Sequence, residues 1–423
     1  MENMENEIKN IMQEIGEKAR VAYRLMAEAK NEQKDLALTK SAIALRNNMA
    51  KIIEANVKDL EYGKQKGLDF AMLDRLTLDE KRIEAMALGL ETICTIPDPV
   101  NKVLEEWDRP NSLKFQKVSI PLGVIGMIYE SRPNVTADAA ALCIKSGNAV
   151  ILRAGSESLH SAQAIADCLH QGLLQASLPA DAVQLVPTRD RAAVGEMLTM
   201  NGVIDVIIPR GGKSLTKRIM EESRVPTILH LDGNCHTYIH KSADISMAKS
   251  VLLNAKMRRV GICGATESLL IDAEIADAFL PQLADILTAK NCEIRGDNKS
   301  QKIDARILPA HDDDWATEYL SAIISVKIVA DIAEAISHIN HYGSHHTDAI
   351  IASDVVVAHQ FLREVDSAIV MHNTSTQFAD GGEFGFGAEI GISTGRLHAR
   401  GPVGAEQLTT YKYIVFGNGQ VRG

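Results

Sequence analysis

The sequence predicts an α/β protein with two main domains, each containing a largely parallel sheet, and a small additional β element. Three observations predict this fold class. The chain has 423 residues, 46% of them hydrophobic, which is enough to bury two large cores. Short apolar runs alternate with helix-patterned stretches between residues 124 and 208, and a second alternation follows residue 244. Such βαβ alternation is typical of parallel sheets covered by helices.

The first hundred residues are predicted to be mostly helical. Apolar residues recur at helical spacing from Ile8 to Ala19, which predicts an amphipathic helix. The same pattern predicts helices over residues 37–60 and 78–92. The last of these should end before Pro97, because proline cannot continue a helix.

The next segment is predicted to contain the first parallel sheet. Residues 113–120 are β-rich and predict a projecting hairpin or an edge strand. Gly147 follows a predicted helix in the position of a C-terminal cap with a left-handed backbone. The predicted strands are 124–128, 149–152, 183–186 and 203–208, and the intervening helices include 136–146 and 156–178.

The second alternation predicts another α/β domain after Asp244. Its predicted elements are a helix ending at Arg258, a strand over 267–271, a helix over 273–289, and strands over 323–329 and 349–352. The tail from Phe384 to Gly423 is rich in glycine and is expected to form loop and an edge element.

Charge and composition exclude several classes of function. The formal net charge of −10 and the pI near 5.7 argue against a nucleic-acid-binding protein, which needs a basic surface. No apolar stretch approaches the roughly 20 residues that span a bilayer, and the N-terminus is too polar for a signal peptide. The six cysteines are scattered without a disulfide pattern. We therefore expect a cytoplasmic protein with reduced thiols.

Cys263 is the strongest candidate for a catalytic residue. It lies between Gly261 and Gly264 at a predicted helix-to-strand junction, with three cations just upstream. Nearby positive charge lowers the pKa of a thiol, and glycines open the backbone around it. Such a thiolate can act as a nucleophile. A buried structural cysteine is the alternative for Cys263 and the expected role of the other five cysteines.

Two predicted strand-to-helix junctions are candidate anion sites. One contains Arg153, and the other contains Gly211, Gly212 and Lys213, where backbone amides at a helix N-terminus suit an anion. Ordinary turns with solvated cations are the alternative. Residue 207 is isoleucine where a Walker A loop needs its first glycine, and residues 385–391 miss the G-x-G-x-x-G spacing.

No metal site is expected from the sequence. A cluster of histidines lies on and after one predicted helix, and Cys235 adjoins His236, but the spacings match no zinc motif. The favoured interpretation is a solvated histidine cluster. Its members are His338, His341, His345 and His346.

Several segments, found in one order along nearly the whole chain, resemble the aldehyde dehydrogenase superfamily and the branch of it that reduces L-glutamyl 5-phosphate. They are residues 121–126 (PLGVIG), 129–136 (YESRPNVT), 147–152 (GNAVIL), 208–212 (IPRGG), 254–256 (NAK), Trp315 with 318–320 (EYL), 380–385 (DGGEFG) and 398–402 (HARGP). The segments at 254–256 and 398–402 distinguish this branch. Gly264, and Val260 with Gly261, depart from the residues more familiar beside the family's cysteine.

The resemblance implies an aldehyde dehydrogenase-like fold of two Rossmann-like domains and an oligomerisation element. The nicotinamide-binding domain would comprise residues 1–104 and 121–243, with a return segment near 372–385. The catalytic domain would comprise residues 244–371. Residues 105–120 and 400–423 would form the oligomerisation hairpin and tail. A homo-oligomer and channelling with glutamate 5-kinase follow as expectations from the same resemblance.

The resemblance also implies roles for particular residues. Cys263 stands at the nucleophile's position, and the backbone amide of Cys263 with the side chain of Asn134 is proposed to stabilise the oxyanion. Arg132 could take that place or bind the substrate's phosphate, and a plain turn at these two positions is the further alternative. Substrate phosphate and carboxylate are assigned to Arg132, Lys256, Arg258, Arg259, Arg396 and Arg400. NADPH is assigned to Arg153, Gly211, Gly212, Lys213 and Glu318.

The implied function is the NADPH-dependent reduction of L-glutamyl 5-phosphate to L-glutamate 5-semialdehyde through a cysteine thioester, the second step of L-proline biosynthesis from glutamate. Residues 230–234 lack the glutamate base of hydrolytic relatives, which fits exchange of the acyl group with phosphate rather than water. Two alternatives remain: a CoA-acylating or hydrolytic aldehyde dehydrogenase, and a catalytically silent binding protein on this fold.

Overall fold

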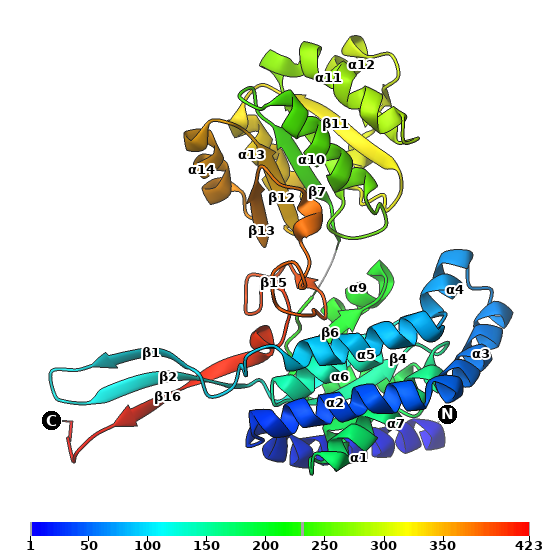
Figure 1. Cartoon of the computed structure of the whole chain (residues 1–423), viewed down its shortest axis with the longest axis vertical. Coiled ribbons are helices and arrows are strands. Elements are labelled where there is room, and N and C mark those ends of the chain that lie inside the picture. The colour runs from blue at the N-terminus through cyan, green and yellow to red at the C-terminus, as the bar shows by residue number, and fades with distance from the viewer. Residues whose placement is uncertain (1, 230–231, 423) are drawn as a thin grey trace. The chain divides into compact units, whose positions relative to one another are not determined.

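The computed structural model describes residues 2–229 and 232–422 and divides the chain into two compact units. Unit 1 contains residues 1–229, 385–391 and 403–423, and unit 2 contains residues 230–384 and 392–402. Figure 1 labels many of the elements of both units. Among the described residues, no helix is long and apolar enough to cross a membrane.

Unit 1 contains a four-stranded parallel sheet in the order β5-β4-β3-β6. The strands are β3 (Val124–Tyr129), β4 (Ala149–Ala154), β5 (Val183–Leu185) and β6 (Val206–Arg210). The helices are α1 (Glu2–Ala27), α2 (Asn31–Asn47), α3 (Met49–Gln65), α4 (Phe70–Leu76), α5 (Glu80–Cys94), α6 (Val135–Lys145), α7 (Leu159–Gln175), α8 (Ala192–Thr199) and α9 (Lys213–Glu222), with a 3-10 turn η1 (Ala180–Ala182). This confirms the predicted βαβ alternation.

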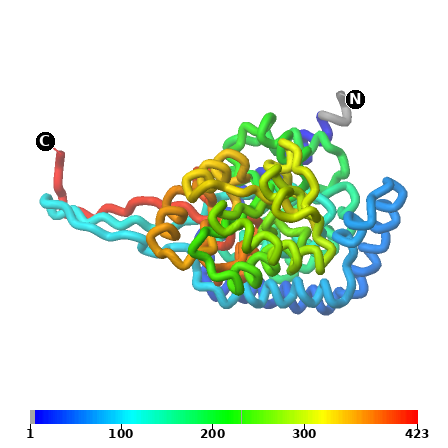
Figure 2. The backbone as a smooth tube through the Cα atoms, turned by 90° about the horizontal axis from the view of Figure 1, so that it is seen from above, coloured from blue at the N-terminus to red at the C-terminus, as the bar shows by residue number. Residues whose placement is uncertain are grey.

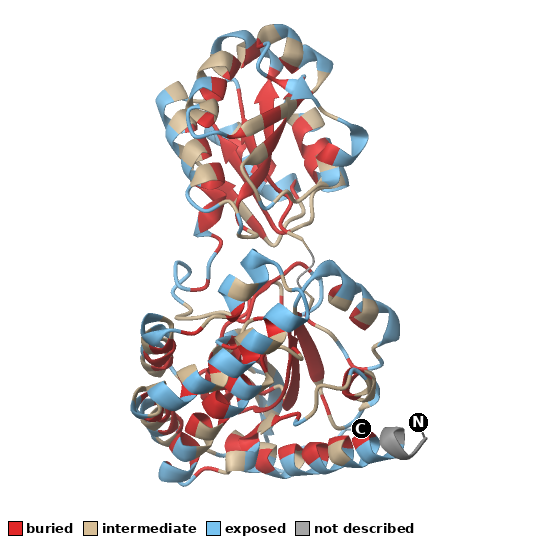
Figure 3. Ribbon diagram, turned by 90° about the vertical axis from the view of Figure 1, so that its right-hand side faces the viewer, coloured by how far each residue is buried: buried red, intermediate tan, exposed pale blue. Residues whose placement is uncertain are grey.

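The order of the strands creates a switch point beside β3. From β3 the chain proceeds outward through β4 and β5, then returns to place β6 on the opposite side of β3. The loops after β3 and β6 therefore diverge at the carboxyl ends of neighbouring strands, which is where open α/β sheets bind ligands. Figure 3 shows the buried strands between helices that expose their outer faces. Ile8 and Met12 of α1 pack with Val124 and Ile128 of β3 in one core.

The helix predicted over residues 37–60 is two helices in the structure. α2 ends at Asn47 and α3 begins at Met49. Asn48 leaves the helical conformation, with φ −104° and ψ 13°, and its side-chain amide donates to the carbonyl of Ala44. A short polar side chain that bonds to nearby backbone competes with the helix, which the apolar periodicity does not reveal.

A three-stranded antiparallel sheet extends from unit 1, as Figure 2 shows from above. Its central strand β2 (Lys114–Pro121) pairs with β1 (Val103–Asp108) and with β16 (Thr409–Phe416), which follows the 3-10 turn η4 (Glu406–Leu408). The ring of Trp107 stacks on Phe115 at 5.5 Å and meets Tyr413 at 6.1 Å. The expected edge element of the tail is thus a full strand, and the predicted hairpin is confirmed.

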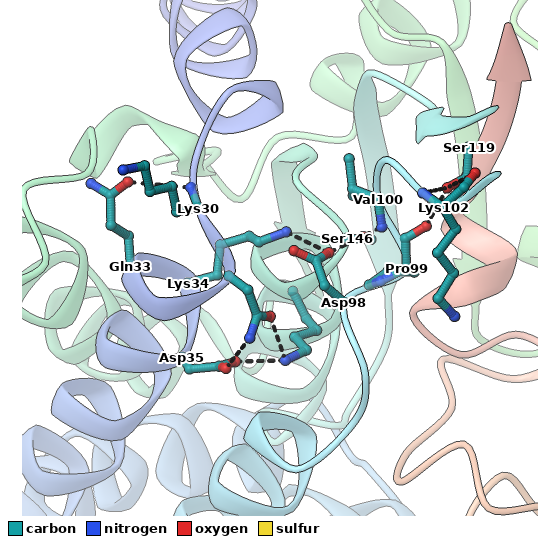
Figure 4. Close-up of polar contacts among 12 residues, drawn as sticks. Lys30, Gln33, Lys34, Asp35, Asp98, Pro99, Val100, Lys102, Ser119 and Ser146 are labelled. Carbon is teal, nitrogen blue, oxygen red and sulfur yellow. Dashed lines mark hydrogen bonds and ion pairs between the residues drawn. The ribbon is translucent and has the colours of Figure 1, made fainter.

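Ion pairs formed by two buried lysines hold the segment that leads into this sheet, as Figure 4 shows. Lys34 Nζ lies 2.7 Å from Asp98 Oδ1, which also accepts the amide of Val100 at 3.0 Å. Lys145 Nζ lies 2.6 Å from Asp35 Oδ1. Both lysines are almost fully buried. Because removing one partner leaves a buried charge, these pairs fix α2, α6 and the segment before β1 in one arrangement.

Unit 2 contains a seven-stranded sheet in the order β10-β9-β11-β8-β7-β12-β13, and all its pairings are parallel. Side chains alternate between its faces: Leu269 packs toward α10 and α11, whereas Leu270 packs toward α13 and α14. The strands are β7 (Cys235–Ile239), β8 (Thr266–Asp272), β9 (Glu293–Gly296), β10 (Leu308–Pro309), β11 (Ile323–Val329), β12 (Thr347–Ile351) and β13 (Ile369–His372). The helices and turns are α10 (Ile245–Met257), α11 (Ala273–Thr288), α12 (Asn298–Ile303), η2 (Asp312–Ala316), α13 (Ile332–Tyr342), α14 (Val355–Glu364) and η3 (Thr376–Phe378).

The unit boundaries differ from those predicted. The prediction placed residues up to 243 with the first domain, but β7 pairs with β8 and β12 of the second sheet. The predicted return segment near 372–385 lies almost wholly in unit 2, because the Thr376 hydroxyl lies 3.0 Å from that of Thr266. The predicted tail from residue 400 is divided, since β15 (Gly401–Pro402) pairs with β14 (Ile392–Ser393) in unit 2. The unit boundaries depend on pairing between strands that are far apart in the sequence, which local apolar periodicity does not reveal.

Candidate active site

Cys263 lies in the loop between α10 and β8, and its side chain is partly exposed. The neighbouring Gly264 is buried against the backbone of the η3 turn, where an added Cβ would lie 3.1 Å from the carbonyl oxygen of Thr376. The loop therefore leaves the thiol of Cys263 partly exposed, while its backbone packs against the η3 turn.

Gly233 supports the backbone of the nucleophile loop. A Cβ at Gly233 would lie 2.0 Å from the carbonyl oxygen of Cys263 and 2.5 Å from its Cα, so only glycine fits here without displacement. The thiol of Cys235 donates to the same carbonyl oxygen at 3.0 Å. Gly233, just before β7, and Cys235, its first residue, thus fix the position of the Cys263 backbone. His230 and Leu231, part of the segment expected to lack a hydrolytic base, lie outside the described residues.

Glu318 is connected to this support. Its Oε1 accepts the backbone amide of Gly233 at 2.9 Å. The side-chain amide of Asn234 donates to the carbonyls of Trp315 and Tyr342, both at 2.9 Å. The structure therefore brings two predicted residues, Cys263 and Glu318, to one place through Gly233, which the sequence analysis did not single out.

The other five cysteines lie in environments that disfavour the thiolate. Burial raises the pKa of Cys168 and Cys292 to about 11 in each case. Burial also raises the pKa of Cys94, Cys143 and Cys235. A thiol with a raised pKa is a poor source of thiolate at neutral pH. These raised pKa values are consistent with the structural role expected for the other five cysteines.

The three cations before Cys263 occupy two different environments. Lys256, in the last turn of α10, is fully buried and forms an ion pair with Glu267 of β8, which is also fully buried. Burial raises the pKa of Glu267 to about 7, although the lysine beside it acts in the opposite direction. Arg258 and Arg259 are exposed. The expectation that Lys256 binds substrate is not met, because its ammonium is enclosed with a protein carboxylate.

Arg396 and Arg400 share one acidic partner. Arg400 Nη1 lies 3.0 Å from Asp366 Oδ1, and Arg396 forms an ion pair with the other oxygen of the same carboxylate. Arg400 also donates to the backbone carbonyl of Asp366 at 3.3 Å. These two predicted substrate residues lie together, on the segment 392–402 that belongs to unit 2.

In unit 1, the loops after β3 and β6 are in contact at their first residues, where they leave the sheet at the switch point. The amide of Gly212, the N-cap of α9, donates to Glu130 Oε2 at 3.0 Å. A Cβ at Gly211 would lie 2.5 Å from the same oxygen. Glu130 therefore provides a carboxylate at the start of α9, beside Lys213. The sequence analysis missed Glu130, although it directly follows an apolar strand.

A second carboxylate organises the loop after β3. Ser131 has a left-handed backbone, with φ 46°, and both its amide and its hydroxyl donate to Glu157 Oε1, at 2.7 and 2.8 Å. Arg132 and Asn134 follow in the same loop. The side-chain amide of Asn134, at the start of α6, donates to Asp138 Oδ2 at 2.9 Å and is exposed.

Arg153 does not face outward. It is 6% exposed, and its guanidinium donates to the carbonyls of Ala154, Arg189 and Asp190 at 2.5, 3.1 and 3.3 Å. Burial lowers the pKa of Arg153. The predicted phosphate-binding arginine thus supports the loop after β5, because carbonyls of that loop already accept its donors.

The histidine cluster is not solvated as a whole. His338 and His346 are buried, and burial lowers the pKa of His338 to about 3. His236 Nδ1 lies 3.0 Å from Asp348 Oδ1, and both residues are fully buried. In the part of the chain that the structure describes, no group of three His, Cys, Asp or Glu residues could hold a metal ion.

Comparisons with known proteins give one consistent result. The model of the aldehyde dehydrogenase family matches residues 4–304. The gamma-glutamyl phosphate reductase of Paramagnetospirillum magneticum is 60% identical over 412 residues, which cover 97% of each chain. That of Rhodospirillum rubrum is 58% identical, over 99% of this chain and 98% of the relative. The crystal structure of gamma-glutamyl phosphate reductase from Thermotoga maritima has a TM-score of 0.95 and 41% identity, and covers 97% of this chain and 100% of that chain.

Proposed function

The chain belongs to the aldehyde dehydrogenase family and, within it, to the gamma-glutamyl phosphate reductases, and we propose that it reduces L-glutamyl 5-phosphate to L-glutamate 5-semialdehyde and phosphate, the second step of L-proline biosynthesis. It is an oxidoreductase that uses a nicotinamide cofactor. The observation that carries the proposal is near full-length identity to relatives of this name, together with a partly exposed thiol on a supported loop.

The thiolate of Cys263 would attack the acyl carbon of the substrate. A C–S bond forms, the C–O bond to phosphate breaks, and phosphate leaves with the electron pair, so the glutamyl group becomes a thioester. The negative charge on the carbonyl oxygen during this step needs donors, for which we propose the backbone amide of Cys263 and the side chain of Asn134. These two residues lie in different units, so their joint role rests on the family resemblance.

The residues at the switch point of unit 1 fit a dinucleotide. Carboxylates at strand ends can accept ribose hydroxyls, and the cation of Lys213 in the first turn of α9 suits a phosphate. We propose that Gly211 to Lys213, with Glu130 and Glu157, hold the cofactor, and that Glu318 binds its nicotinamide ribose. When bound there, the nicotinamide would supply the hydride that reduces the carbonyl carbon. Cys263 then leaves as a thiolate when the thiohemiacetal collapses to the semialdehyde.

We propose NADPH as the physiological cofactor. Arg191 supports this, because it is exposed and follows the edge strand β5 on the loop whose carbonyls accept the buried guanidinium of Arg153. A cation held on this loop favours an additional phosphate. An Arg191→Glu variant should lose preference for NADPH over NADH, and an unchanged ratio of the two kcat/KM values would contradict this assignment.

For substrate recognition and assembly we retain the expectations from the resemblance as proposals. Arg132, Arg258, Arg259, Arg396 and Arg400 would share the substrate's phosphate and carboxylate groups. The sheet of β1, β2 and β16 would join copies of the chain into a homo-oligomer, which its exposed Tyr413 and Phe416 support. A cytoplasmic location and channelling with glutamate 5-kinase belong to the same proposal.

The reaction run in reverse tests this function most completely. With L-glutamate 5-semialdehyde and NADP⁺, the protein should sustain turnover, and so form more than one equivalent of NADPH, only when inorganic phosphate is present. Turnover that depends on CoA, or that proceeds without phosphate, would favour the other aldehyde dehydrogenase activities. Absence of turnover under all three conditions would favour a binding protein.

A further inference from the structure

The loop that carries Glu318 is held at three successive residues. Glu318 accepts the amide of Gly233, as described above. The hydroxyl of Tyr319 donates to Asp314 Oδ1 at 2.7 Å, and the amide of Leu320 donates to Glu267 Oε1 at 3.2 Å. Three consecutive anchors on one loop indicate that its position matters for more than connection of η2 to β11.

Leu320 needs such an anchor because its backbone is unfavourable. Its φ of 52° lies in the left-handed region, which a leucine rarely adopts. The side chain of Leu320 is 41% exposed and therefore gains little from packing. The bond from its amide to the buried carboxylate of Glu267 is thus the contact that stabilises this conformation directly.

The pair formed by Lys256 and Glu267 connects this loop to the nucleophile. Lys256 lies in the last turn of α10, seven residues before Cys263 in the sequence, and its Nζ lies 5.9 Å from the centre of the Tyr319 ring. Arg295 lies 5.4 Å from the same ring and also pairs with Asp314 at 2.9 Å. One buried ion pair therefore touches α10, β8 and two of the three anchored residues.

We propose that Lys256 and Glu267 form a buried clamp that positions Glu318 and, through Gly233, the loop of Cys263. Both are positioning residues: the pair is enclosed, and it acts through Leu320, Tyr319 and Gly233. This role deepens the proposed function and rests on it, since Glu318 is the proposed ligand of the nicotinamide ribose. It also explains why a fully buried charge is kept beside the nucleophile loop.

Two double variants separate positioning from simple stability. Lys256→Met with Glu267→Gln removes both charges but keeps an oxygen that can accept the amide of Leu320. Lys256→Met with Glu267→Met removes the charges and that oxygen. The Met/Met variant should raise the KM for NADPH about tenfold more than the Met/Gln variant does. Only the Met/Met variant loses the hydrogen bond from the amide of Leu320, and one hydrogen bond can account for an effect of this size. The matched control is Lys241→Met with Glu274→Gln, an exposed ion pair in the same unit, which should leave KM unchanged.

A purely structural role predicts a different result. It would make both double variants lose thermal stability and active-site titre together, with the same KM for NADPH, and that outcome would overturn the clamp. If the double variants do not fold, Tyr319→Phe tests the same loop by removal of one hydroxyl. It should raise the KM for NADPH about threefold with kcat nearly constant, and an unchanged KM would overturn the proposal.

A readout without substrate separates failure of the clamp from failure of the proposed function. Alkylation of Cys263 by iodoacetamide should differ at least about threefold in rate between the Met/Met and Met/Gln variants, because the support through Gly233 shifts. Equal rates would count against the clamp whatever the natural substrate is. If the rates differ but the wild-type protein shows no phosphate-dependent turnover, the proposed function fails and the clamp stands.

Discussion

The candidate residues of the two units lie at opposite ends of their parallel strands. In unit 1, Glu130 to Asn134 and Gly211 to Lys213 follow the carboxyl ends of β3 and β6. In unit 2, Gly233 precedes β7, Cys263 precedes β8 and Glu318 precedes β11, so all three lie at the amino ends. The rule that ligands bind beyond carboxyl ends locates the first group and fails for the second.

This difference shows what each sheet contributes. The switch point of unit 1 provides diverging loops, whose glycines and carboxylates suit a dinucleotide. In unit 2, the buried ion pair of Lys256 and Glu267, together with Gly233, instead fixes the loop of Cys263 at the amino ends of the strands. Variants of Cys263 and of the glycine that supports it should alter the chemical step, and variants of Gly211 to Lys213 or of the loop of Glu318 should alter cofactor binding.

The largest effect is expected for Cys263→Ser. A hydroxyl is a much weaker nucleophile than a thiolate, so kcat of the phosphate-dependent reverse reaction should fall by at least about a thousandfold. Cys94→Ser is the matched control, since Cys94 is also partly exposed but burial raises its pKa. A Cys263→Ser protein that retains more than about a tenth of the wild-type kcat would remove the thiol from the mechanism.

Gly233→Ala should have the next largest effect. The new Cβ would overlap the backbone of Cys263, so kcat should fall about a hundredfold and the free energy of unfolding should fall by about 1–3 kcal/mol. Gly261→Ala is the control in the same loop, because its Cβ would meet its first neighbour only at 3.9 Å. Equal kcat values for the two variants would show that Gly233 does not position the nucleophile.

In unit 1, Gly211→Ala should affect binding and leave the chemical step nearly unchanged. Its Cβ would approach Glu130 Oε2 to 2.5 Å and displace that carboxylate, so the KM for the cofactor should rise about tenfold with kcat within about twofold. At Gly212 the Cβ would lie 4.0 Å from the same oxygen, and alanine there serves as the control. A fall in kcat without a change in KM would reverse the assignment of this end of the sheet.

The smallest effect is expected for the dependence of stability on pH. His338 has a pKa of about 3 in the folded protein, below its ordinary 6.5, so the unfolded chain binds more protons between these values. The contribution of His338 to the free energy of unfolding is therefore fully present above about pH 6.5. It is lost as the pH falls, by about 1–2 kcal/mol between pH 7 and pH 5. His338→Phe should flatten the dependence of the melting temperature on pH in this range relative to wild type. The exposed His359→Gln serves as the control, and a slope that His338→Phe leaves unchanged would contradict the buried, neutral state of His338.

Local sequence signals predicted most of the fold but not its boundaries. Apolar periodicity located β3, β4, β8 and β11, and the left-handed Gly147 ends α6 as expected. The break at Asn48 was missed because it depends on a side-chain bond to one carbonyl. The assignment of β7 to the second sheet depends on pairing with strands that begin far away in the sequence, which no local pattern contains.

The candidate site was predicted in the same uneven way. The glycines around Cys263 singled out its loop as a candidate, since they act on their immediate neighbours. Lys256 and Arg153 were assigned to ligands because their charge is visible in the sequence, whereas their burial is not. Glu267 was overlooked, although a glutamate inside the strand predicted over residues 267–271 is a signal that its carboxylate has a partner.

The central claim is that Cys263 holds the glutamyl group as a thioester that phosphate releases. We would incubate the protein with L-glutamate 5-semialdehyde and NADP⁺ without phosphate, quench, and map hydroxylamine-sensitive acyl groups by mass spectrometry. The account predicts a burst of NADPH equal to the enzyme concentration, an acyl group on the peptide that contains Cys263, and its loss when phosphate is added. Steady turnover without phosphate, or an acyl group on another residue, would contradict it.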